Sequence, residues 1–506
     1  MKLSRFNLKH ITSENIQIPD ETIFELPEKV LQFGTGVLLR GLPDYFIDKA
    51  NRMGLFGGRI VVVKSTRQGD TNAFSKQDGL YTVSVRGIEA GEKVEENIIN
   101  ASISRVLDAH TEWTQILECA HNRNMQVIIS NTTEVGIQLV HDNIRQHPPT
   151  SYPGKLLAFL YERFKAFEGS KHSGLVILPT ELITDNGKKL ESIVLELAHL
   201  NSLEDSFIEW LETYNYFCNT LVDRIVPGKP DAEMLAQLNG ELGYEDDLLT
   251  VSEVYRLWAI EGGEEVANVL TFAQADAGVI IKPDIQIYRE LKLRLLNGTH
   301  TLSCGLAFLA HCNTVKDAMD SETVSTFIHH LMMAELAPAI PYDVSVEEAR
   351  AFGEKVLDRF RNPHIKHQWI SITMQYSSKM KMRCLPLLQQ HYSVHQHAPE
   401  AFALGFAAYL AFTRPVQLKD NKYYGTFDGA LYVIQDDVAA QFYSRWQQLT
   451  PEALVMQTLK DVAYWGADLS QLPHFQQAVT EHLQNILSKG MIAAIHHLQN
   501  KTEIVA

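Results

Sequence analysis

The sequence predicts an α/β fold, with a parallel sheet in the N-terminal part of the chain and mostly α-helices in the C-terminal part. Short apolar strands alternate with helical patterns through the first half of the 506 residues. The first strand runs into a Gly-x-Gly turn and a helix, as in a Rossmann-type fold. After residue 300 the apolar residues are spaced as on helices. We therefore expect a Rossmann-type dinucleotide-binding domain over 1–285 and a helical substrate and catalytic domain over 286–506.

The glycine turn is the first candidate for cofactor binding. A short apolar strand ends at Phe33 and leads into Gly34, Thr35 and Gly36, after which a helical pattern begins. Gly34 permits a tight turn, and Gly36 lets backbone N–H groups approach a pyrophosphate at the start of the helix. The third glycine of the usual pattern is missing from the sequence, so the turn needs support from elsewhere in the chain.

Charged residues near the first two strands bear on which nicotinamide cofactor is bound. Arg40 either contributes positive charge for the pyrophosphate or is an ordinary surface residue. The second strand spans 59–64, and an acid near its end would bind the ribose 2′-hydroxyl of NAD. Asp70 is the nearest acid, whereas Ser65 and Arg67 would suit the 2′-phosphate of NADP. These residues alone do not decide whether the cofactor is NAD or NADP.

Two later apolar strands, 125–130 and 175–178, end in polar residues. Ligands of open α/β sheets collect beyond the carboxyl ends of the strands. Small hydroxyl side chains after the first of these strands are therefore candidates for contact with the nicotinamide ribose, with N-capping of a helix as the alternative. The candidates after the first strand are Thr132, Thr133 and Glu134, and Glu181 follows the second.

Two further segments of the first half carry polar residues in apolar surroundings. A turn beginning at residue 77 feeds a strand of alternating apolar and polar residues that runs to residue 87. Asp223 and Arg224 lie within an apolar run, and buried charges need partners. They are therefore either a structural pair or part of a pocket.

Lys292, Asn297 and His300 are spaced so that one helix end can present all three to a single cavity. Offsets of five and eight residues fall within roughly 140° of arc on an α-helix. A lysine can donate and accept a proton, an asparagine N–H can hold a developing alkoxide, and a histidine can fix a hydroxyl or the lysine. Together they suit carbonyl–alcohol interconversion without a metal. The alternative is an amphipathic helix with its leucines inside and its polar residues outside.

The chain after His300 is expected to be helical, and it carries two basic groups. The groups span 364–367 and 377–383, and either would meet a substrate carboxylate; Lys379 is the favoured residue. Pro473 is expected in the first turn of the last helix named here, where a missing N–H costs nothing. The expected helices span 301–312, 322–336, 345–361, 402–412, 438–448 and 473–489.

Composition excludes several classes of partner. The formal charge is −16, which disfavours general binding to nucleic acid or to an anionic membrane. The longest apolar run, 401–412, is too short to span a bilayer, and residues 1–24 lack the apolar centre of a signal peptide. The five scattered cysteines indicate a reduced, cytoplasmic protein without a zinc site. A histidine group at 391–397 has neither an acid nor a cysteine nearby, so we interpret it as a surface loop.

Five motifs occur in one order, and together they carry a family resemblance. The chain resembles the long-chain mannitol dehydrogenase family of polyol and uronate dehydrogenases. The stretches 130–134, 218–225, 295–300 and 359–367 narrow the resemblance to the uronate-reducing members, and it extends from about residue 30 to residue 491. The five motifs are Gly-x-Gly-x-x-x-Arg at 34–40, Gln-Asp-Gly-Leu-Tyr at 77–81, Thr-Glu at 133–134, Val-Asp-Arg-Ile at 222–225 and the spaced Lys, Asn and His at 292–300.

The resemblance implies a metal-free, NAD-dependent hydride transfer to or from a small hexuronate or aldonate, in an active site between the two domains. It implies that Lys292 is the general acid and base, that Asn297 polarises the carbonyl and that His300 positions the substrate or the lysine. Nucleic acid and membrane partners are not expected, and the protein is expected to be a monomer or a small homo-oligomer. Asp70 lies near the family's ribose-binding aspartate, which favours NAD. Asp223 supports the site, and Lys379 lies where the family often places a substrate-side lysine.

Two departures argue against a plain mannitol enzyme. Many polyol members carry Cys-Asp-Asn-Leu after the fifth strand, and 179–182 here reads Pro-Thr-Glu-Leu. A carboxylate cannot donate to an oxyanion, so Glu181 either accepts a bond from a sugar hydroxyl or pairs with Lys292. Glu290 also stands two residues before the lysine, whereas polyol members often place a glutamate three before it.

Overall fold

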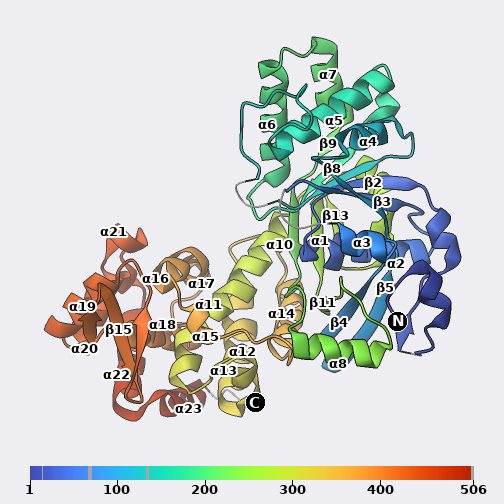
Figure 1. The fold of residues 1–506 in the computed structure, drawn as a ribbon. Coiled ribbons are helices and arrows are strands. Elements are labelled where there is room, and N and C mark those ends of the chain that lie inside the picture. Colours follow the sequence, from blue (N-terminus) through green and yellow to red (C-terminus); the bar gives the residue numbers. More distant parts are fainter. Residues whose placement is uncertain (14, 67–70, 133–135, 503–506) are drawn as a thin grey trace. The chain divides into compact units, whose positions relative to one another are not determined.

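The chain forms two compact units in a computed structural model, which describes residues 1–13, 15–66, 71–132 and 136–502. The first unit comprises Met1–Arg86 and Lys93–Ile285, and the second comprises Gly87–Glu92 and Gln286–Ala506. The first is an α/β structure and the second is mostly helical (Figure 1), which confirms the fold class predicted from the sequence.

A six-stranded parallel sheet forms the centre of the first unit. Its strands lie in the order β6-β3-β2-β7-β8-β9, and all neighbours are parallel. Numbered along the chain from β2, this is the order 3-2-1-4-5-6 of the doubly wound dinucleotide-binding fold. The strands are β2 (Glu28–Phe33), β3 (Arg59–Lys64), β6 (Ile103–Asp108), β7 (Val127–Ser130), β8 (Val176–Pro179) and β9 (Tyr216–Phe217).

Alternate side chains of this sheet enter two different cores. On β2, Val30 packs with residues of α1 and α2, whereas Leu31 and Phe33 pack with residues of α4 to α7. Figure 1 shows α4 to α7 gathered on one side of the sheet. Because both faces are covered, the strands are nearly continuous apolar runs. The helices are α1 (Val37–Gly41), α2 (Pro43–Arg52), α4 (Trp113–Glu118), α5 (Tyr152–Ala166), α6 (Asn186–Leu200) and α7 (Asp205–Tyr214).

Two smaller sheets complete the first unit, in the orders β1-β5-β4-β11 and β10-β12-β13. The strand expected to end at residue 87 is β4, and its polar residues are buried along with its apolar ones. Thr82, for example, donates its N–H to Asp246 Oδ2 at 2.6 Å. The remaining elements are β1 (Ile16–Gln17), α3 (Asn72–Lys76), β4 (Tyr81–Glu89), β5 (Glu92–Asn100), β10 (Thr220–Asp223), α8 (Ala232–Leu242), β11 (Thr250–Glu253), β12 (Leu257–Glu261), α9 (Glu264–Val269) and β13 (Val279–Lys282).

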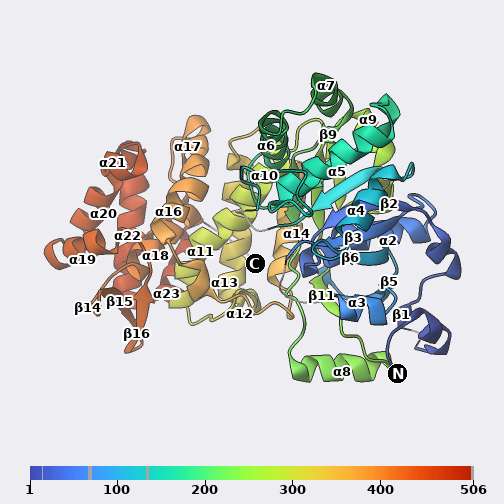
Figure 2. The ribbon, with the colours of Figure 1, turned by 45° about the horizontal axis from the view of Figure 1, so that its top comes forward.

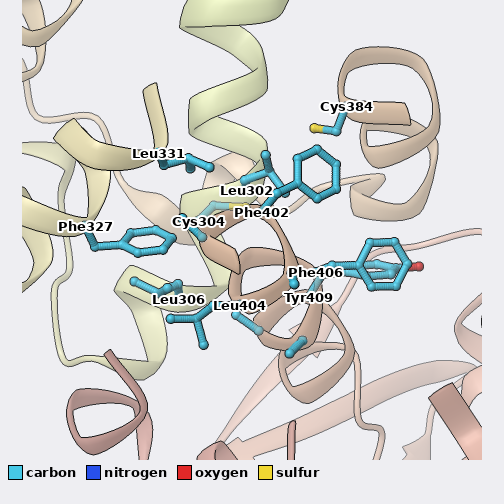
Figure 3. Close-up of a cluster of buried hydrophobic side chains, with 14 of the residues drawn as sticks. Leu302, Cys304, Leu306, Phe327, Leu331, Cys384, Phe402, Leu404, Phe406 and Tyr409 are labelled. Carbon is cyan, nitrogen blue, oxygen red and sulfur yellow. The ribbon is translucent and has the colours of Figure 1, made fainter. Parts of the chain in front are cut away.

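Helix α18 (Glu400–Phe412) is the central helix of the second unit, and almost all of its residues are buried. It packs between α11 (Asn297–Leu309) and α22 (Phe475–Lys489), which lie beside it in both ribbon views (Figure 2). Figure 3 shows Phe402, Leu404 and Phe406 of α18 among side chains of α11 and α13 (Glu322–His330). A helix that is apolar on all sides must be covered on all sides, so this run forms a core helix.

The boundaries of three other helices differ from expectation. The helix expected over 301–312 is α11, which begins at Asn297 and ends at Leu309. The helix expected over 322–336 is α13 followed by a π-helical turn, Leu331–Leu336. Pro473 is not in the first turn of α22, because His474 adopts a positive φ of 62° and the helix begins only after it. The remaining elements are α10 (Gln286–Leu291), α12 (Val315–Asp320), α14 (Val346–Phe360), α15 (Trp369–Ile372), α16 (Tyr376–Lys379), α17 (Leu385–Val394), β14 (Gln417–Lys419), β15 (Lys422–Phe427), β16 (Ala430–Ile434), α19 (Ala439–Gln448), α20 (Pro451–Leu459), α21 (Val462–Trp465) and α23 (Met491–Thr502).

Candidate active site

The carboxyl ends of β2 and β7 lie side by side at the point where the strand order of the parallel sheet reverses. From β2 the chain proceeds to β3 and β6 on one side, and from β7 it proceeds to β8 and β9 on the other. The N–H of Asn131, after β7, donates to the carbonyl of Phe33 at 3.2 Å. Dinucleotides bind in the crevice at such a reversal. Two candidate segments that are distant in sequence therefore meet at one edge of the sheet.

The two glycines of the first turn are required for different reasons. Gly34 has a φ of +131°, and a Cβ there would lie 2.9 Å from Leu39 Cδ1 and 3.1 Å from the Asn131 carbonyl oxygen. Gly36 has a φ of −65°, and a Cβ there would meet no described atom within 4 Å. Backbone conformation and packing thus explain Gly34 but not Gly36. The open space at Gly36 is what close approach of an external group to the backbone needs.

Phe33, Thr35 and Arg40 occupy different environments around this turn. Phe33 is fully buried and packs on the Tyr152 ring at 5.2 Å, whereas Thr35 is partly exposed. Arg40 is buried, and its Nη1 donates to the Leu248 carbonyl at 2.9 Å. Burial also lowers the pKa of Arg40. The alternative that Arg40 is an ordinary surface residue is therefore wrong, and these contacts favour a packing role over pyrophosphate binding.

Glu181 organises the polar end of β7. Its carboxylate is buried and accepts hydrogen bonds from the Thr132 N–H at 2.8 Å, the Thr132 hydroxyl at 2.9 Å and the Ser130 hydroxyl at 3.2 Å. The Glu181 carboxylate thus accepts bonds that shape the neighbouring strand end. Three of the candidates for cofactor contact, Asp70, Thr133 and Glu134, lie outside the described residues, as does Arg67.

Asp223 and Arg224 follow one another at the end of β10, and both are buried. Arg224 donates from Nε to the Glu253 carbonyl at 2.9 Å and from Nη1 to the Gly41 carbonyl at 2.6 Å. Its guanidinium lies 4.4 Å from the centre of the Tyr45 ring, and burial lowers its pKa to about 10. These contacts support a structural role for Arg224, which ties β10 to the end of α1.

Lys292, Asn297 and His300 lie on one continuous helical segment of the second unit. Lys292 begins a π-helical turn, Lys292–Leu296, that separates α10 from α11, and the N–H of Asn297 donates to the Lys292 carbonyl. This five-residue hydrogen bond closes a wider turn than an α-helix has, and such turns often occur at functional sites. It brings Asn297 closer to the face of Lys292 than regular α-helical spacing would. Lys292 and Asn297 are partly exposed, whereas His300 is buried.

The His300 imidazole is held among aromatic rings. It stacks on Phe360 with ring centres 4.3 Å apart, and it meets the edges of His367 at 5.2 Å and Trp369 at 5.7 Å. Its Nε2 is buried and has no hydrogen-bond partner among the described residues. A buried polar nitrogen without a partner is costly, which suggests that this atom serves a ligand.

Positive charge surrounds the same histidine. Burial lowers the pKa of His300 well below its usual value, and His367, Arg359, Arg383 and Lys379 lower it further. The imidazole is therefore neutral near pH 7, so it can orient a hydroxyl without carrying charge. His367 of the basic group at 364–367 thus lies near His300. So do Lys379 and Arg383 of the basic group at 377–383.

Arg294 braces the helix that carries these cations. Its Nε donates to Glu290 Oε2 at 2.9 Å, and its Nη1 donates to the carbonyls of Met382 at 2.7 Å and Arg383 at 3.0 Å. Those two carbonyls belong to another π-helical turn, Met380–Cys384. Sequence analysis missed this brace, although the four-residue spacing of Glu290 and Arg294 is the usual one for a helical ion pair.

Other described features limit the chemistry. All five cysteines are free and buried. Among the described residues, no group of three or more His, Cys, Asp or Glu side chains is arranged to hold a metal ion. Within the same residues no helix combines the length and the apolarity needed to span a membrane.

Models of two domain families match this chain. The mannitol dehydrogenase Rossmann domain matches residues 28–273, and the mannitol dehydrogenase C-terminal domain matches residues 284–487. The chain belongs to the mannitol dehydrogenase family. Within this family, the altronate oxidoreductase of Bacillus subtilis (strain 168) is 38% identical over 476 residues, which is 93% of this chain and 95% of the relative. The altronate oxidoreductase of Yersinia enterocolitica is 37% identical over 478 residues, which is 93% of this chain and 96% of the relative.

Solved structures of two dehydrogenases share the fold. Substrate-free D-sorbitol dehydrogenase superposes with a TM-score of 0.75 at 19% identity, covering 98% of this chain and all of the other. Pseudomonas fluorescens mannitol 2-dehydrogenase, in a ternary complex with NAD and D-mannitol, superposes with a TM-score of 0.63 at 21% identity, covering 99% of this chain. At these identities the likeness shows the common architecture alone.

Proposed function

We propose that the protein is an NAD-dependent altronate oxidoreductase that interconverts D-tagaturonate and D-altronate. The observation that carries the proposal is its identity of 36 to 38% with altronate oxidoreductases over nearly the whole of both chains. The second unit also contains a helix that presents a lysine, an asparagine and a histidine, beside cations suited to an acidic sugar. We place the reaction in the cytoplasm, in line with the free cysteines.

The residues of the first unit fit a dinucleotide. The open space at Gly36 and the turn that Gly34 makes with its positive φ suit a pyrophosphate that approaches the backbone at the start of α1. Thr132, fixed by Glu181 at the end of β7, is suited to contact the nicotinamide ribose. We extend this role to Thr133 and Glu134, which follow Thr132 in the sequence. We assign Asp70 to the ribose 2′-hydroxyl of NAD, as the family resemblance implies. When bound, NAD(H) supplies or accepts the hydride.

The residues of the second unit supply the proton chemistry. We propose that Lys292 gives a proton to the carbonyl oxygen during reduction and takes the hydroxyl proton during oxidation. The Asn297 carboxamide N–H donates to the same oxygen as charge develops on it. The Nε2 of neutral His300, which has no hydrogen-bond partner in the described part of the chain, binds a substrate hydroxyl next to the reacting carbon. We assign Asp223 a supporting role and Lys379 a contact with the substrate, as the family resemblance implies.

The experiment that tests the proposal is a substrate panel. The purified protein is assayed with tagaturonate, fructuronate and fructose, each with NADH and with NADPH. We expect the highest kcat/KM with tagaturonate and NADH. Preference for fructuronate would make the protein a fructuronate reductase, and preference for fructose a polyol dehydrogenase. Cofactor binding without turnover of any keto sugar or keto acid would instead indicate a nucleotide-binding regulator without catalytic activity.

A further inference from the structure

Two half-buried cations next to His300, Lys379 and Arg383, have no carboxylate partner in the described part of the chain. The Lys379 ammonium donates to the Ile372 carbonyl at 2.8 Å, and Arg383 Nη1 donates to the Thr301 hydroxyl at 3.3 Å. Both partners are neutral. Burial lowers the pKa of each cation, and the charge of Arg383 lowers the pKa of Lys379 further.

This arrangement contrasts with neighbouring arginines in the same unit. Arg294 is paired with Glu290 at 2.9 Å and Arg361 with Asp358 at 3.2 Å. The chain has 61 acidic residues against 45 lysines and arginines, so acidic partners are plentiful. Two like charges that are four residues apart and half-buried destabilise each other unless an anion lies between them. Within the described residues, this place therefore carries positive charge that no carboxylate neutralises.

The structure places the Arg383 guanidinium close to the reacting groups. The Thr301 hydroxyl, to which Arg383 donates, itself donates to the Asn297 carbonyl at 2.7 Å. Thr301 also directly follows His300 on α11. The backbone of Arg383 is fixed by the bond from Arg294 to its carbonyl. The side chain is thus anchored at both ends beside the turn that carries Asn297 and His300.

We propose that Arg383 is the residue that selects acidic substrates, by binding the substrate carboxylate together with Lys379. This inference rests on the proposed function and deepens it, because Arg383 distinguishes a keto acid from a neutral keto sugar. A guanidinium has five N–H donors in a planar fork, and only one is bound to Thr301. The remaining donors suit a carboxylate, which accepts two parallel bonds from such a fork.

The test compares acid and neutral substrates in Arg383→Gln, Arg383→Lys and a matched control. The matched control is Lys381→Gln, which removes a charge from the same π-helical turn. Lys381 differs from Arg383 in that its ammonium lies over the Tyr464 ring, 5.4 Å from the ring centre. We expect Arg383→Gln to lower kcat/KM for tagaturonate about 10- to 100-fold, mainly through KM, because charge-assisted bonds are worth that factor. Turnover of fructose should change little, Arg383→Lys should recover part of the loss, and Lys381→Gln should resemble wild type.

A second measurement does not depend on turnover of a neutral sugar. D-gluconate and sorbitol are compared as inhibitors of the wild type and of Arg383→Gln, and the variant should lose the preference for the acid. If the wild type reduces no keto acid, the proposed function fails, and the inhibitor comparison alone then decides whether Arg383 selects acids. If the wild type reduces tagaturonate but Arg383→Gln keeps the wild-type preference for acids, the inference about Arg383 is overturned and the function stands. Equal losses with acid and neutral substrates, or an equal loss in Lys381→Gln, also overturn it.

Discussion

Replacement of Gly36 by alanine separates cofactor binding from folding stability. The backbone there has a φ of −65°, and the new Cβ would meet no described atom within 4 Å. A glycine-to-alanine change at a compatible site stabilises a protein by about 0.4–1 kcal/mol, and the loss of glycine at a helix N-cap offsets a few tenths of that. We therefore expect the Tm of Gly36→Ala to lie within about 2 °C of wild type.

Gly34→Ala is the matched variant in the same turn. Its φ of +131° is strained for alanine, and its Cβ would lie 2.9 Å from Leu39 Cδ1 and 3.1 Å from the Asn131 carbonyl. Strain of this kind costs about 1–3 kcal/mol, which corresponds to a fall in Tm of about 3–10 °C for a domain of this size. The two alanines should thus differ in stability, although each adds a single methyl group.

The assay is NADH binding, measured by fluorescence titration alongside thermal unfolding. The methyl group at Gly36 would stand where the pyrophosphate approaches the backbone, so we expect Gly36→Ala to bind NADH at least about 10-fold more weakly. This corresponds to the loss of one charge-assisted hydrogen bond of about 1.5–3 kcal/mol. Binding within about two-fold of wild type would refute the assignment of the pyrophosphate to this turn.

Two further predictions concern stability and the brace of the second unit. Burial raises the pKa of Asp44 to about 7, so the folded state keeps a proton between pH 3.8 and 7 that the unfolded chain loses. Folding stability therefore falls by about 4 kcal/mol as pH rises through that window. The Tm advantage of Asp44→Asn, which cannot ionise, should grow from pH 5 to pH 8.5; a constant difference would contradict this. Arg294→Met should lower kcat and destabilise the fold by about 3 kcal/mol, because it leaves the Glu290 carboxylate, which is only 14% exposed, without its cation. Arg294→Lys should recover part of the kcat and part of the stability. An unchanged kcat in Arg294→Met would show that the bonds made by Arg294 do not support the active site.

The parallel sheet was predictable because each of its strands can be recognised from a short run of consecutive residues. Strands buried on both faces are continuous apolar runs, and the run over 59–64 became β3 with the same bounds. Gly34 was predictable for the same reason, since only glycine adopts its φ without strain. The core helix α18 followed from an apolar run too short for a membrane.

The features that sequence could not supply depend on partners distant in the chain. Nothing near Arg40 indicates that its guanidinium reaches the Leu248 carbonyl, and nothing near Glu181 indicates that it accepts bonds from Thr132. The prediction for Lys292, Asn297 and His300 assumed regular α-helical spacing and therefore missed the π-helical turn at Lys292. The sequence supplies candidates for the reacting residues, whereas tertiary packing decides which polar groups remain available to a ligand.

The measurement that tests the central claim most directly is the turnover of Lys292→Ala with tagaturonate and NADH, with the NADH affinity determined on the same preparation. Lys366→Ala serves as the control, because Lys366 is exposed on the loop that follows α14. We predict that Lys292→Ala loses about 10²- to 10⁴-fold in kcat while NADH affinity and Tm stay near wild type. A kcat within about 10-fold of wild type would contradict proton transfer by Lys292.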